Sequence, residues 1–523
     1  MSASLVILNA NIITLNPKQP KATAIAVQNG RIVAVGSNAK VRKHIAKSTK
    51  IIDANNKTVV PGLVDCHIHM TEFGFFLQTP DLRNAQSIKE MQQKLREHAS
   101  KTRGKSWIQG GRWDQEKFAE KRYPTRWDLD AAVSDRPVFL VRVCGHIGVA
   151  NTQALRLAGI TKETVVEGGK IDLDETSGQP CGIIEGNAMR LIWKVVPKPS
   201  SEVLEEACLL TCKKAVEAGL TGVHWLVETT DEIRAIKKLD SEGKLPIRAY
   251  LGVPLKLMEG LANLGLSTAA ADSMVRMGFV KLFADGSLGS RTAALKEPYS
   301  DEPESTGLLL HSKKKLCQIV LKAHKAGFQV GVHAIGDRGI ENVLDAYEEA
   351  LKRFPMEDHR HRIEHCSVLN PQLIRRMKKL CLIASVQPHF VVSDPWIVDR
   401  VGRKRARWVY PFKTLVKKGV VVASGSDCPI EDISPLLGIW AAVAKRSPDE
   451  RLTVKEALGS YTLNAVYASF DEDKKGTIEV GKLADFTVLS DDLFNIEPDM
   501  INKVVVEMTV VDGKVVYARE DSF

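Results

Sequence analysis

Short apolar segments separated by turn residues mark both ends of the chain. Within residues 1–60, Asn29-Gly30 stands between two alternating apolar runs and predicts a β-hairpin. The C-terminal residues repeat this pattern. Neither end has enough strands to be stable alone, so we expect one composite β-sandwich domain built from residues 1–60 and 473–523. Its C-terminal strands are expected at 476–480, 486–489, 504–511 and 514–517.

The middle of the chain alternates between apolar strand patterns and amphipathic helix patterns. Eight strand-then-helix units favour a closed (β/α)8 TIM barrel, an α/β fold, over an open doubly wound sheet. An open sheet would place a glycine-rich phosphate loop after its first strand, whereas this strand ends in His67-Ile68-His69. The strands are predicted at 63–67, 222–226, 247–253, 279–283, 329–333, 362–365, 383–387 and 420–425. The helices are predicted at 202–218, 231–242, 267–277, 313–326, 338–353, 371–379 and 411–418.

A long segment separates the first predicted barrel strand from the second. Residues 71–200 are expected to form an inserted lobe over the barrel mouth, because loops on the C-terminal face of a barrel carry such insertions. The barrel itself would consist of residues 61–70 and 201–472. His146 in the lobe is a candidate substrate-binding residue, and a structural role in the lobe is an equal alternative.

The composition of the 523 residues is that of an ordinary globular protein, with 44% hydrophobic and 26% charged residues. This excludes a mainly disordered chain, a collagen and a small cystine-rich scaffold. The apolar runs are too short to span a membrane, and residues 1–10 lack the features of a signal peptide. The nine cysteines are scattered, so we expect a cytoplasmic protein with reduced thiols and no membrane partner.

The net charge is strongly positive, because 73 lysines and arginines outnumber 63 aspartates and glutamates by 10. Such a charge is compatible with a nucleic acid partner. However, the most basic run, at residues 400–407, is not accompanied by a nucleic-acid-binding motif. We therefore expect a small-molecule substrate and no nucleic acid, and we interpret the charge as a property of the surface.

Potential metal ligands stand at the C-terminal ends of the predicted barrel strands. His67 and His69 follow the first strand, and residues i and i+2 of a strand point to the same face, so both imidazoles can meet one ion. His333 and His365 end two successive predicted strands, and Asp427 follows the last one. Each lone histidine could instead be structural, but the repetition at strand ends favours metal binding. Asp427 could bind the metal, accept a proton from its water, or both.

Lys281 lies inside an apolar predicted strand and should be buried on one face. A buried ammonium group without a partner is unfavourable, so its pKa falls. The neutral amine can react with carbon dioxide to form a carbamate, whose two oxygens can bridge two cations. In the alternative, Lys281 remains an amine that pairs with Asp285 or Asp427, or it extends outward into solvent. With this lysine, nitrogen and oxygen donors converge on one barrel mouth, and they suit zinc first, then manganese, iron or nickel.

These residues and the segments around them resemble the metal-dependent amidohydrolase superfamily, in particular the branch of N-substituted formamide deformylase-like proteins. The resemblance covers essentially the whole chain, including the lobe at 145–151 and the C-terminal segment 476–485. The segments 285–293 and 333–337 also match. The candidate positions match the pattern of the branch one by one and in order: His67, His69, Lys281, His333, His365 and Asp427.

The resemblance implies a distorted barrel with one or two divalent cations per chain, and a homo-oligomer, most simply a dimer. In binuclear members of the superfamily, a lysine carboxylated on its side-chain nitrogen bridges the two ions. The ligands would then divide into two groups beside a carboxylated Lys281, with His67, His69 and Asp427 around one ion and His333 and His365 around the other.

The implied reaction is hydrolysis of a C–N bond of amide type, outside peptides, by a metal-activated water. Asp427 would be the catalytic residue that takes the proton from this water and passes it to the leaving amine. Two alternatives stay open. The same site could hydrolyse a carbamate, lactone or phosphotriester, or the chain could be a non-catalytic metal-binding regulatory protein. Relatives of the second kind typically lose metal ligands, and here all six positions are present.

Overall fold

The computed structural model describes residues 2–101, 107–268 and 273–520, and it divides into two compact units. Unit 1 comprises Met1–Met70 and Thr211–Phe523, and unit 2 comprises Thr71–Leu210. Among the described residues, no helix is long and apolar enough to cross a membrane. The chain therefore leaves one folded unit after Met70 and returns to it at Thr211.

Eight parallel strands in unit 1 form the predicted barrel, in the order β20-β19-β18-β17-β16-β15-β14-β8. Along each strand both faces are buried, as a barrel covered by helices requires. These strands are β8 (Leu63–Ile68), β14 (Leu220–Leu226), β15 (Arg248–Pro254), β16 (Val275–Phe283), β17 (Gln329–Ala334), β18 (Arg362–His365), β19 (Ile383–Val386) and β20 (Val421–Ser424). All eight overlap the predicted strands, so the fold class is confirmed.

The seam between the first and last barrel strands is irregular. Ladder pairing runs from β8 through to β20, but closure between these two is made by residues just after β20. The Asp427 N–H donates to the carbonyl of His67 at 2.7 Å, and the His69 N–H donates to the carbonyl of Cys428 at 2.9 Å. The barrel is therefore irregular where His67 and His69 meet Asp427 and Cys428, and three of these four residues are candidate metal ligands.

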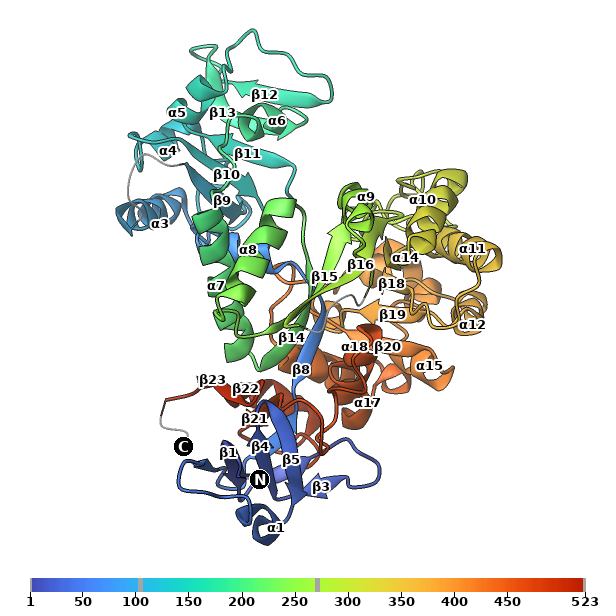
Figure 1. Ribbon diagram of the computed structural model, residues 1–523. Coiled ribbons are helices and arrows are strands. Elements are labelled where there is room, and N and C mark those ends of the chain that lie inside the picture. Colours follow the sequence, from blue (N-terminus) through green and yellow to red (C-terminus); the bar gives the residue numbers. More distant parts are fainter. Residues whose placement is uncertain (1, 102–106, 269–272, 521–523) are drawn as a thin grey trace. The chain divides into compact units, whose positions relative to one another are not determined.

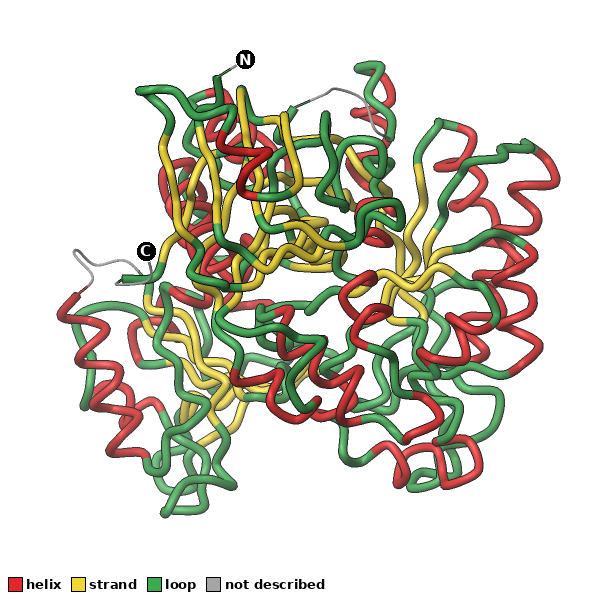
Figure 2. The backbone as a smooth tube through the Cα atoms, turned by 90° about the horizontal axis from the view of Figure 1, so that it is seen from below, coloured by secondary structure: helices red, strands yellow, loops and turns green. Residues whose placement is uncertain are grey.

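Helices lie along the outer side of the converging barrel strands (Figure 2). Asn370 caps one of them by accepting from the backbone N–H groups of Gln372 and Leu373, beside Pro371 in the first turn. The helices that follow the barrel strands are α8 (Thr230–Ser241), α9 (Leu255–Asn263), α10 (Lys313–Lys325), α11 (Asp337–Arg353), α12 (Pro371–Lys379) and α15 (Phe412–Lys417). Further helices of unit 1 are α1 (Asn38–Arg42), α13 (Phe390–Ser393), α14 (Ile397–Ala406), α16 (Pro435–Trp440), α17 (Val454–Ser460) and α18 (Leu463–Ala468), and α7 (Ser201–Glu217) leads into β14.

One predicted helix is wrong. The prediction at 267–277 partly covers residues 269–272, which lie outside the described residues, and its end is strand, because β16 begins at Val275. The helix of this repeat is α9, immediately after β15. Val275 pairs with Ala249 of β15 in the parallel ladder, and this sheet pairing overrides the helical spacing of its neighbours.

The two ends of the chain build one β-domain of two sheets. In Figure 1 the blue N-terminal strands and the red C-terminal strands lie together. Antiparallel pairing of β7 with β21 joins the two ends, and Ile25, Val59 and Phe486 share one buried core. One sheet has the order β5-β4-β1-β6, from β1 (Leu5–Leu8), β4 (Ala24–Gln28), β5 (Arg31–Gly36) and β6 (Lys50–Asp53). The other has the order β23-β22-β21-β7-β2-β3, from β2 (Asn11–Ile13), β3 (Lys21–Ala22), β7 (Thr58–Pro61), β21 (Phe486–Leu489), β22 (Val506–Val511) and β23 (Lys514–Ala518).

The strand predicted at 476–480 is absent from the described residues, which form bends and irregular structure there. Gly476 and Gly481 have φ angles of 91° and 92°, in the left-handed region, which interrupts an extended strand. Ile478 between them is nevertheless buried in the core of the β-domain, and its N–H donates to the carbonyl of Thr14 at 2.9 Å. The apolar character of the segment thus reflects burial without sheet pairing.

A buried ion pair holds the barrel to the β-domain and gives a testable prediction. Arg248 of β15 donates to both carboxylate oxygens of Asp485, at 2.7 and 3.1 Å, and the Asp485 side chain is 3% exposed. We expect Arg248→Ala to lower the free energy of unfolding by about 3–5 kcal/mol, because Asp485 would stay buried without its main counter-ion. Urea unfolding measures the change.

Arg234→Ala, in an exposed pair with Asp231, is the matched control and should change the free energy of unfolding by about 0.5 kcal/mol or less. Equal effects of the two variants would contradict this role of Arg248.

Unit 2 contains its own sheet, with the order β12-β13-β11-β10-β9. Trp113, Phe118 and Leu140 lie in one of its two buried cores. Its strands are β9 (Ile108–Trp113), β10 (Val138–Arg142), β11 (Ile147–Ala150), β12 (Gly169–Leu173) and β13 (Pro180–Gly186). Its helices are α2 (Met70–Leu77), α3 (Ile88–Lys101), α4 (Arg126–Asp130), α5 (Thr152–Leu157) and α6 (Met189–Trp193). The inserted lobe is thus a folded body, and its predicted position over the barrel mouth stays a prediction.

Candidate metal centre

The C-terminal ends of the barrel strands bring the six predicted metal-site residues together. The parallel register aligns Phe283 of β16 with His333 of β17, and Ala334 with His365 of β18. Successive strands therefore end at the same level, which sets their terminal side chains around one opening. The six residues come from β8, β16, β17, β18 and the segments that follow β8 and β20: His67, His69, Lys281, His333, His365 and Asp427.

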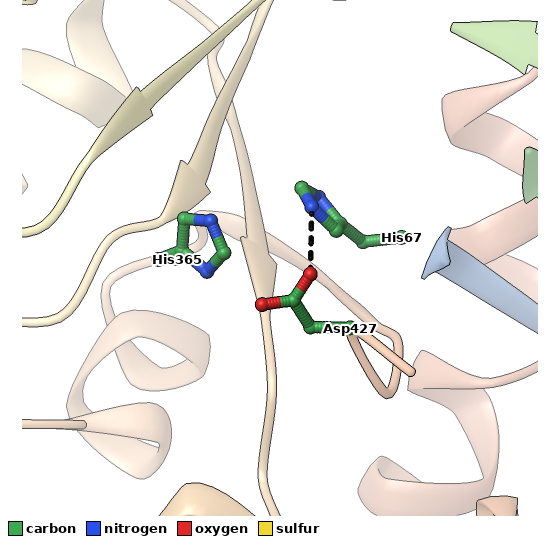
Figure 3. Close-up of side chains that lie close together, drawn as sticks. All are labelled: His67, His365 and Asp427. Carbon is green, nitrogen blue, oxygen red and sulfur yellow. Dashed lines mark ion pairs between the residues drawn. The ribbon is translucent and has the colours of Figure 1, made fainter. Parts of the chain in front are cut away.

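Asp427 lies at the centre of the group. One of its carboxylate oxygens, Oδ1, is 3.3 Å from Nε2 of His67 and 3.3 Å from Nε2 of His69. Figure 3 shows the ring of His67 directed at this carboxylate, with the ring of His365 nearby. Burial alone would raise the pKa of Asp427, but its close contacts with His67 and His69 hold it well below its usual range. Asp427 is therefore a carboxylate in this site.

His365 and His333 continue the group on the other side. The ring centroids of His365 and His67 are 4.8 Å apart, and those of His365 and His333 are 4.4 Å apart. Donor atoms of His67, His365 and Asp427 all lie within 4.8 Å of one another. Burial lowers the pKa of His333 to about 3 and that of His365 well below its usual value, so both rings are neutral and can offer a lone pair.

Lys281 points into the same group from β16. Its Nζ is 3.4 Å from Nε2 of His67 and 4.8 Å from the centroid of the Phe283 ring. The residue is 7% exposed, and burial lowers the pKa of its amine to about 8. Among the described residues, neither Asp285 nor Asp427 forms an ion pair with this amine. The alternative in which Lys281 pairs with one of these aspartates is therefore not what the structure contains.

Asp285 instead holds two loops beside the site. Its carboxylate accepts hydrogen bonds from the backbone N–H groups of Ala294, Ile335 and Gly336, at 2.9, 3.0 and 2.8 Å. Burial raises the pKa of this carboxyl group to about 7, against the effect of these three donors. Asp285 thus fixes the backbone that follows β16 and β17, next to His333.

Two polar residues missed by the sequence reasoning orient the histidines. Nδ1 of His67 donates to Oε2 of Glu364 at 2.5 Å, and Nδ1 of His365 donates to Oε1 of Gln387 at 2.7 Å. The positive charge of Arg362 and the hydrogen bond from His67 hold the pKa of Glu364 well below its usual range in spite of its burial. The sequence does contain one signal for Glu364. Arg362 and Glu364 stand two positions apart in a short barrel strand and so point to the same face, where charged residues are unusual.

Two candidate ligands have strained backbone. His365 and Asp427 have φ angles of 69° and 59°, which non-glycine residues seldom adopt. Such conformations cost about 1–3 kcal/mol each and persist where the surrounding structure imposes them, often at functional sites. The strain at these positions is consistent with side chains held in place for chemistry.

The donor chemistry of the site fits a divalent cation. Because Nδ1 of His67 donates to Glu364, a neutral ring presents only a lone pair at Nε2, and this lone pair faces a carboxylate oxygen of Asp427 at 3.3 Å. His365 is oriented by Gln387 in the same way, and Nε2 of His333 donates to the carbonyl of Gly286 at 3.1 Å, which leaves its Nδ1 lone pair. Electron pairs that face one another are stabilised by a cation between them, and nitrogen and carboxylate donors suit zinc.

His146 lies in unit 2, exposed on the turn between β10 and β11, where its carbonyl accepts from the N–H of Gly186. Its role as a substrate contact stays a prediction. A histidine that the sequence reasoning did not select, His389, follows β19. Its Nδ1 lies 2.5 Å from Oε2 of Glu431, a residue of the segment after β20 that also carries Asp427.

Comparison with known proteins identifies relatives over almost the whole chain. The family model described as "Amidohydrolase family" matches residues 50–517. The Bacillus subtilis (strain 168) protein YtcJ is 35% identical over 97% of this chain and 98% of its own length. N-substituted formamide deformylase of Arthrobacter pascens is 29% identical over 99% of both chains. A solved structure, an uncharacterized metal-dependent hydrolase from Pyrococcus furiosus, is 32% identical and covers 94% of this chain and 100% of its own, with a TM-score of 0.81.

Proposed function

Because the chain belongs to the amidohydrolase family, we propose that it is a metal-dependent hydrolase that cleaves a C–N bond of amide type in a small molecule. The observation that supports this most strongly is the convergence of ring nitrogens of His67, His69 and His365 on the carboxylate of Asp427. A relative named N-substituted formamide deformylase supports an amide-type bond, and a structural neighbour named as a metal-dependent hydrolase supports the metal.

We assign the cation, zinc first and one or two per chain, to His67, His69, His333, His365 and Asp427. When bound, such a cation supplies Lewis-acid chemistry, which polarises a substrate carbonyl and lowers the pKa of a water molecule. The protein supplies the rest through the orientation of its side chains. Glu364 and Gln387 fix which nitrogen of each ring faces the centre, and burial keeps bulk water from competing for these donors.

Asp427 is assigned the proton transfer. Its Oδ1 faces the centre, between His67 and His69, and the group is ionised, so it can accept a proton from the attacking water. Protonated Asp427 would then give this proton to the leaving nitrogen as the C–N bond breaks. One side chain would thus act first as general base and then as general acid.

Lys281 is assigned a carbamate that would bridge two cations. Its Nζ lies 3.4 Å from Nε2 of His67, so a carboxyl group on this nitrogen would reach the centre. We expect intact-protein mass spectrometry under native conditions to show one added carbon dioxide, and acid denaturation to remove it. Lys281→Met should lack the added mass and should bind fewer metal ions. A native mass without the added carbon dioxide, in protein that holds two metals, would contradict the bridging role.

An assay panel tests the proposed reaction. The purified protein, supplied with zinc or manganese, would be offered N-substituted formamides and other small amides beside a carbamate, a lactone and a phosphotriester. We expect metal-stimulated release of an amine from an amide. Cleavage of only the carbamate, the lactone or the phosphotriester would support the metal centre but contradict the amide bond. No metal-stimulated hydrolysis of any substrate would favour a regulatory role.

We also propose that the protein acts as a homodimer and that His146 contacts the substrate, both on the resemblance to the family. Analytical ultracentrifugation tests the first. For the second, His146→Ala should raise KM with little change in kcat. Monomeric protein, or an unchanged KM, would contradict the respective assignment.

A further inference from the structure

A continuous hydrogen-bonded network runs inside the barrel below the metal centre. Arg362 and Glu364 are both fully buried, and they stand two positions apart in β18, which places them on the same face. The guanidinium donates from Nε to Oε1 of Glu364 at 2.5 Å and from Nη2 to Oε2 at 3.1 Å. A buried pair of this kind gains little net stability over apolar residues of the same size, so its presence calls for another explanation.

Further hydrogen bonds fix the orientation of the Arg362 guanidinium, and with it the position of Glu364. Arg362 donates from Nη2 to the carbonyl of Cys66 and to the hydroxyl of Ser385, and its Nη1 donates to Nδ1 of His224 at 2.8 Å. The guanidinium carbon Cζ lies over the ring of Phe279, 4.3 Å from its centroid. Each end of the guanidinium is therefore engaged, and it cannot rotate without breaking several buried hydrogen bonds.

Glu364 has one further contact that leads to the metal centre. Its Oε2 accepts from Nδ1 of His67 at 2.5 Å and from the hydroxyl of Ser385 at 2.7 Å. Because every neighbour of Oε2 is a donor, the proton of His67 is kept on Nδ1. The opposite nitrogen, Nε2, is then obliged to present its lone pair toward Asp427.

We infer that Arg362 and Glu364 are positioning residues that fix the metal-binding tautomer of His67. Arg362 holds the Glu364 carboxylate, and the carboxylate in turn sets which ring nitrogen faces the cation. The inference rests on the proposed function, because it assigns the network to the same metal centre. It goes further by tracing the orientation of His67 back to Arg362, which holds the Glu364 carboxylate in place.

Glu364→Gln separates this role from simple packing, because glutamine has the same shape. Its amide nitrogen must occupy the position of Oε1 or of Oε2. At the Oε1 position it would oppose the short bond from Nε of Arg362, at 2.5 Å. At the Oε2 position it would oppose only the longer bond from Nη2, at 3.1 Å, and there Ser385 and His67 can reverse their roles. The amide nitrogen would therefore face His67 and move the ring proton to Nε2, where it blocks metal binding.

The experiment measures zinc affinity of the full-length apoprotein by competition with a chelating dye, together with the thermal unfolding temperature of the same apoprotein. We expect Glu364→Gln to bind zinc about 10–100-fold more weakly, and its apoprotein to unfold at a lower temperature than the wild type, because Arg362 would stay buried without its counter-ion. The zinc affinities are compared at a temperature at which both apoproteins are folded. Glu232→Gln is the matched control, since Glu232 is a buried glutamate in the first turn of α8 whose carboxylate accepts from the hydroxyl of Thr229. It should bind zinc like the wild type.

Each outcome decides the inference. Wild-type zinc affinity in Glu364→Gln would overturn it and leave the proposed function standing, whereas wild-type protein that does not bind zinc would overturn both. If Glu364→Gln does not fold, Ser385→Ala takes its place, because it removes one donor to Oε2 and keeps Arg362 and Glu364. Several-fold weaker zinc binding by this variant supports the inference, and unchanged binding overturns it.

Discussion

Replacing Asp427 by asparagine is expected to lower kcat by about 10²–10⁴-fold, which is the usual contribution of a general base and acid. Asparagine has nearly the same shape as aspartate but cannot accept the proton of the attacking water. The histidine ligands are unchanged in this variant. We therefore expect Asp427→Asn to keep much of its bound metal while turnover is lost.

The backbone conformation at Asp427 is one that asparagine can adopt without rearrangement. Asp427 has a φ angle of 59°, a left-handed conformation that asparagine tolerates as well as aspartate does. The hydrogen bond from the Asp427 N–H to the carbonyl of His67 should therefore survive. An effect on kcat would then report the lost carboxylate rather than a rearranged strand end.

Steady-state kinetics and metal content of the same preparation measure the result. Asp231→Asn, at an exposed aspartate at the start of α8, is the matched control and should have wild-type kcat and metal content. Near-normal turnover by Asp427→Asn would show that the proton transfer belongs to another group.

Replacing His67 by alanine should remove metal and activity together. His67 lies at the junction of the site, because its Nε2 faces both Asp427 and Lys281 and its Nδ1 donates to Glu364. Loss of an orienting partner alone costs about 10–100-fold in metal affinity, so loss of the ligand should cost more than about 100-fold.

The readouts for His67→Ala are zinc affinity and kcat/KM, with the apoprotein's circular dichroism as a check of folding. His44→Ala, in the segment between β5 and β6 of the β-domain, is the control and should leave both unchanged. A variant of His67 that keeps wild-type zinc affinity would place the cation elsewhere. Loss of activity with metal retained would instead make His67 a substrate-binding or catalytic group.

The barrel could be predicted from the sequence because its strands are short apolar runs bounded by polar residues, and their order along the chain is their order in the sheet. The ligand candidates could be found for the same reason, since His67, His333 and His365 stand where such runs end. The helix at 267–277 and the strand at 476–480 were wrong, because sheet pairing at Val275 and the left-handed Gly476 outweigh the local apolar pattern.

The polar interior of the barrel could not be predicted in the same way. Glu364 stands directly before His365 in the sequence, yet it orients His67, which is 297 positions away along the chain. Similarly, Gln387 supports His365 from the next strand, and Asp285 binds backbone rather than Lys281. Such partners depend on strand register and side-chain direction in three dimensions, and a single sequence does not specify them.

Metal analysis of the purified full-length protein tests the central claim most directly. Inductively coupled plasma mass spectrometry should find one or two equivalents of a divalent metal per chain, zinc foremost. Removal of this metal by a chelator should abolish hydrolysis of the amide substrate found in the panel, and added zinc should restore it. Protein that carries no divalent metal, binds none when it is supplied and shows no metal-stimulated hydrolysis would contradict a metal-dependent function for this chain.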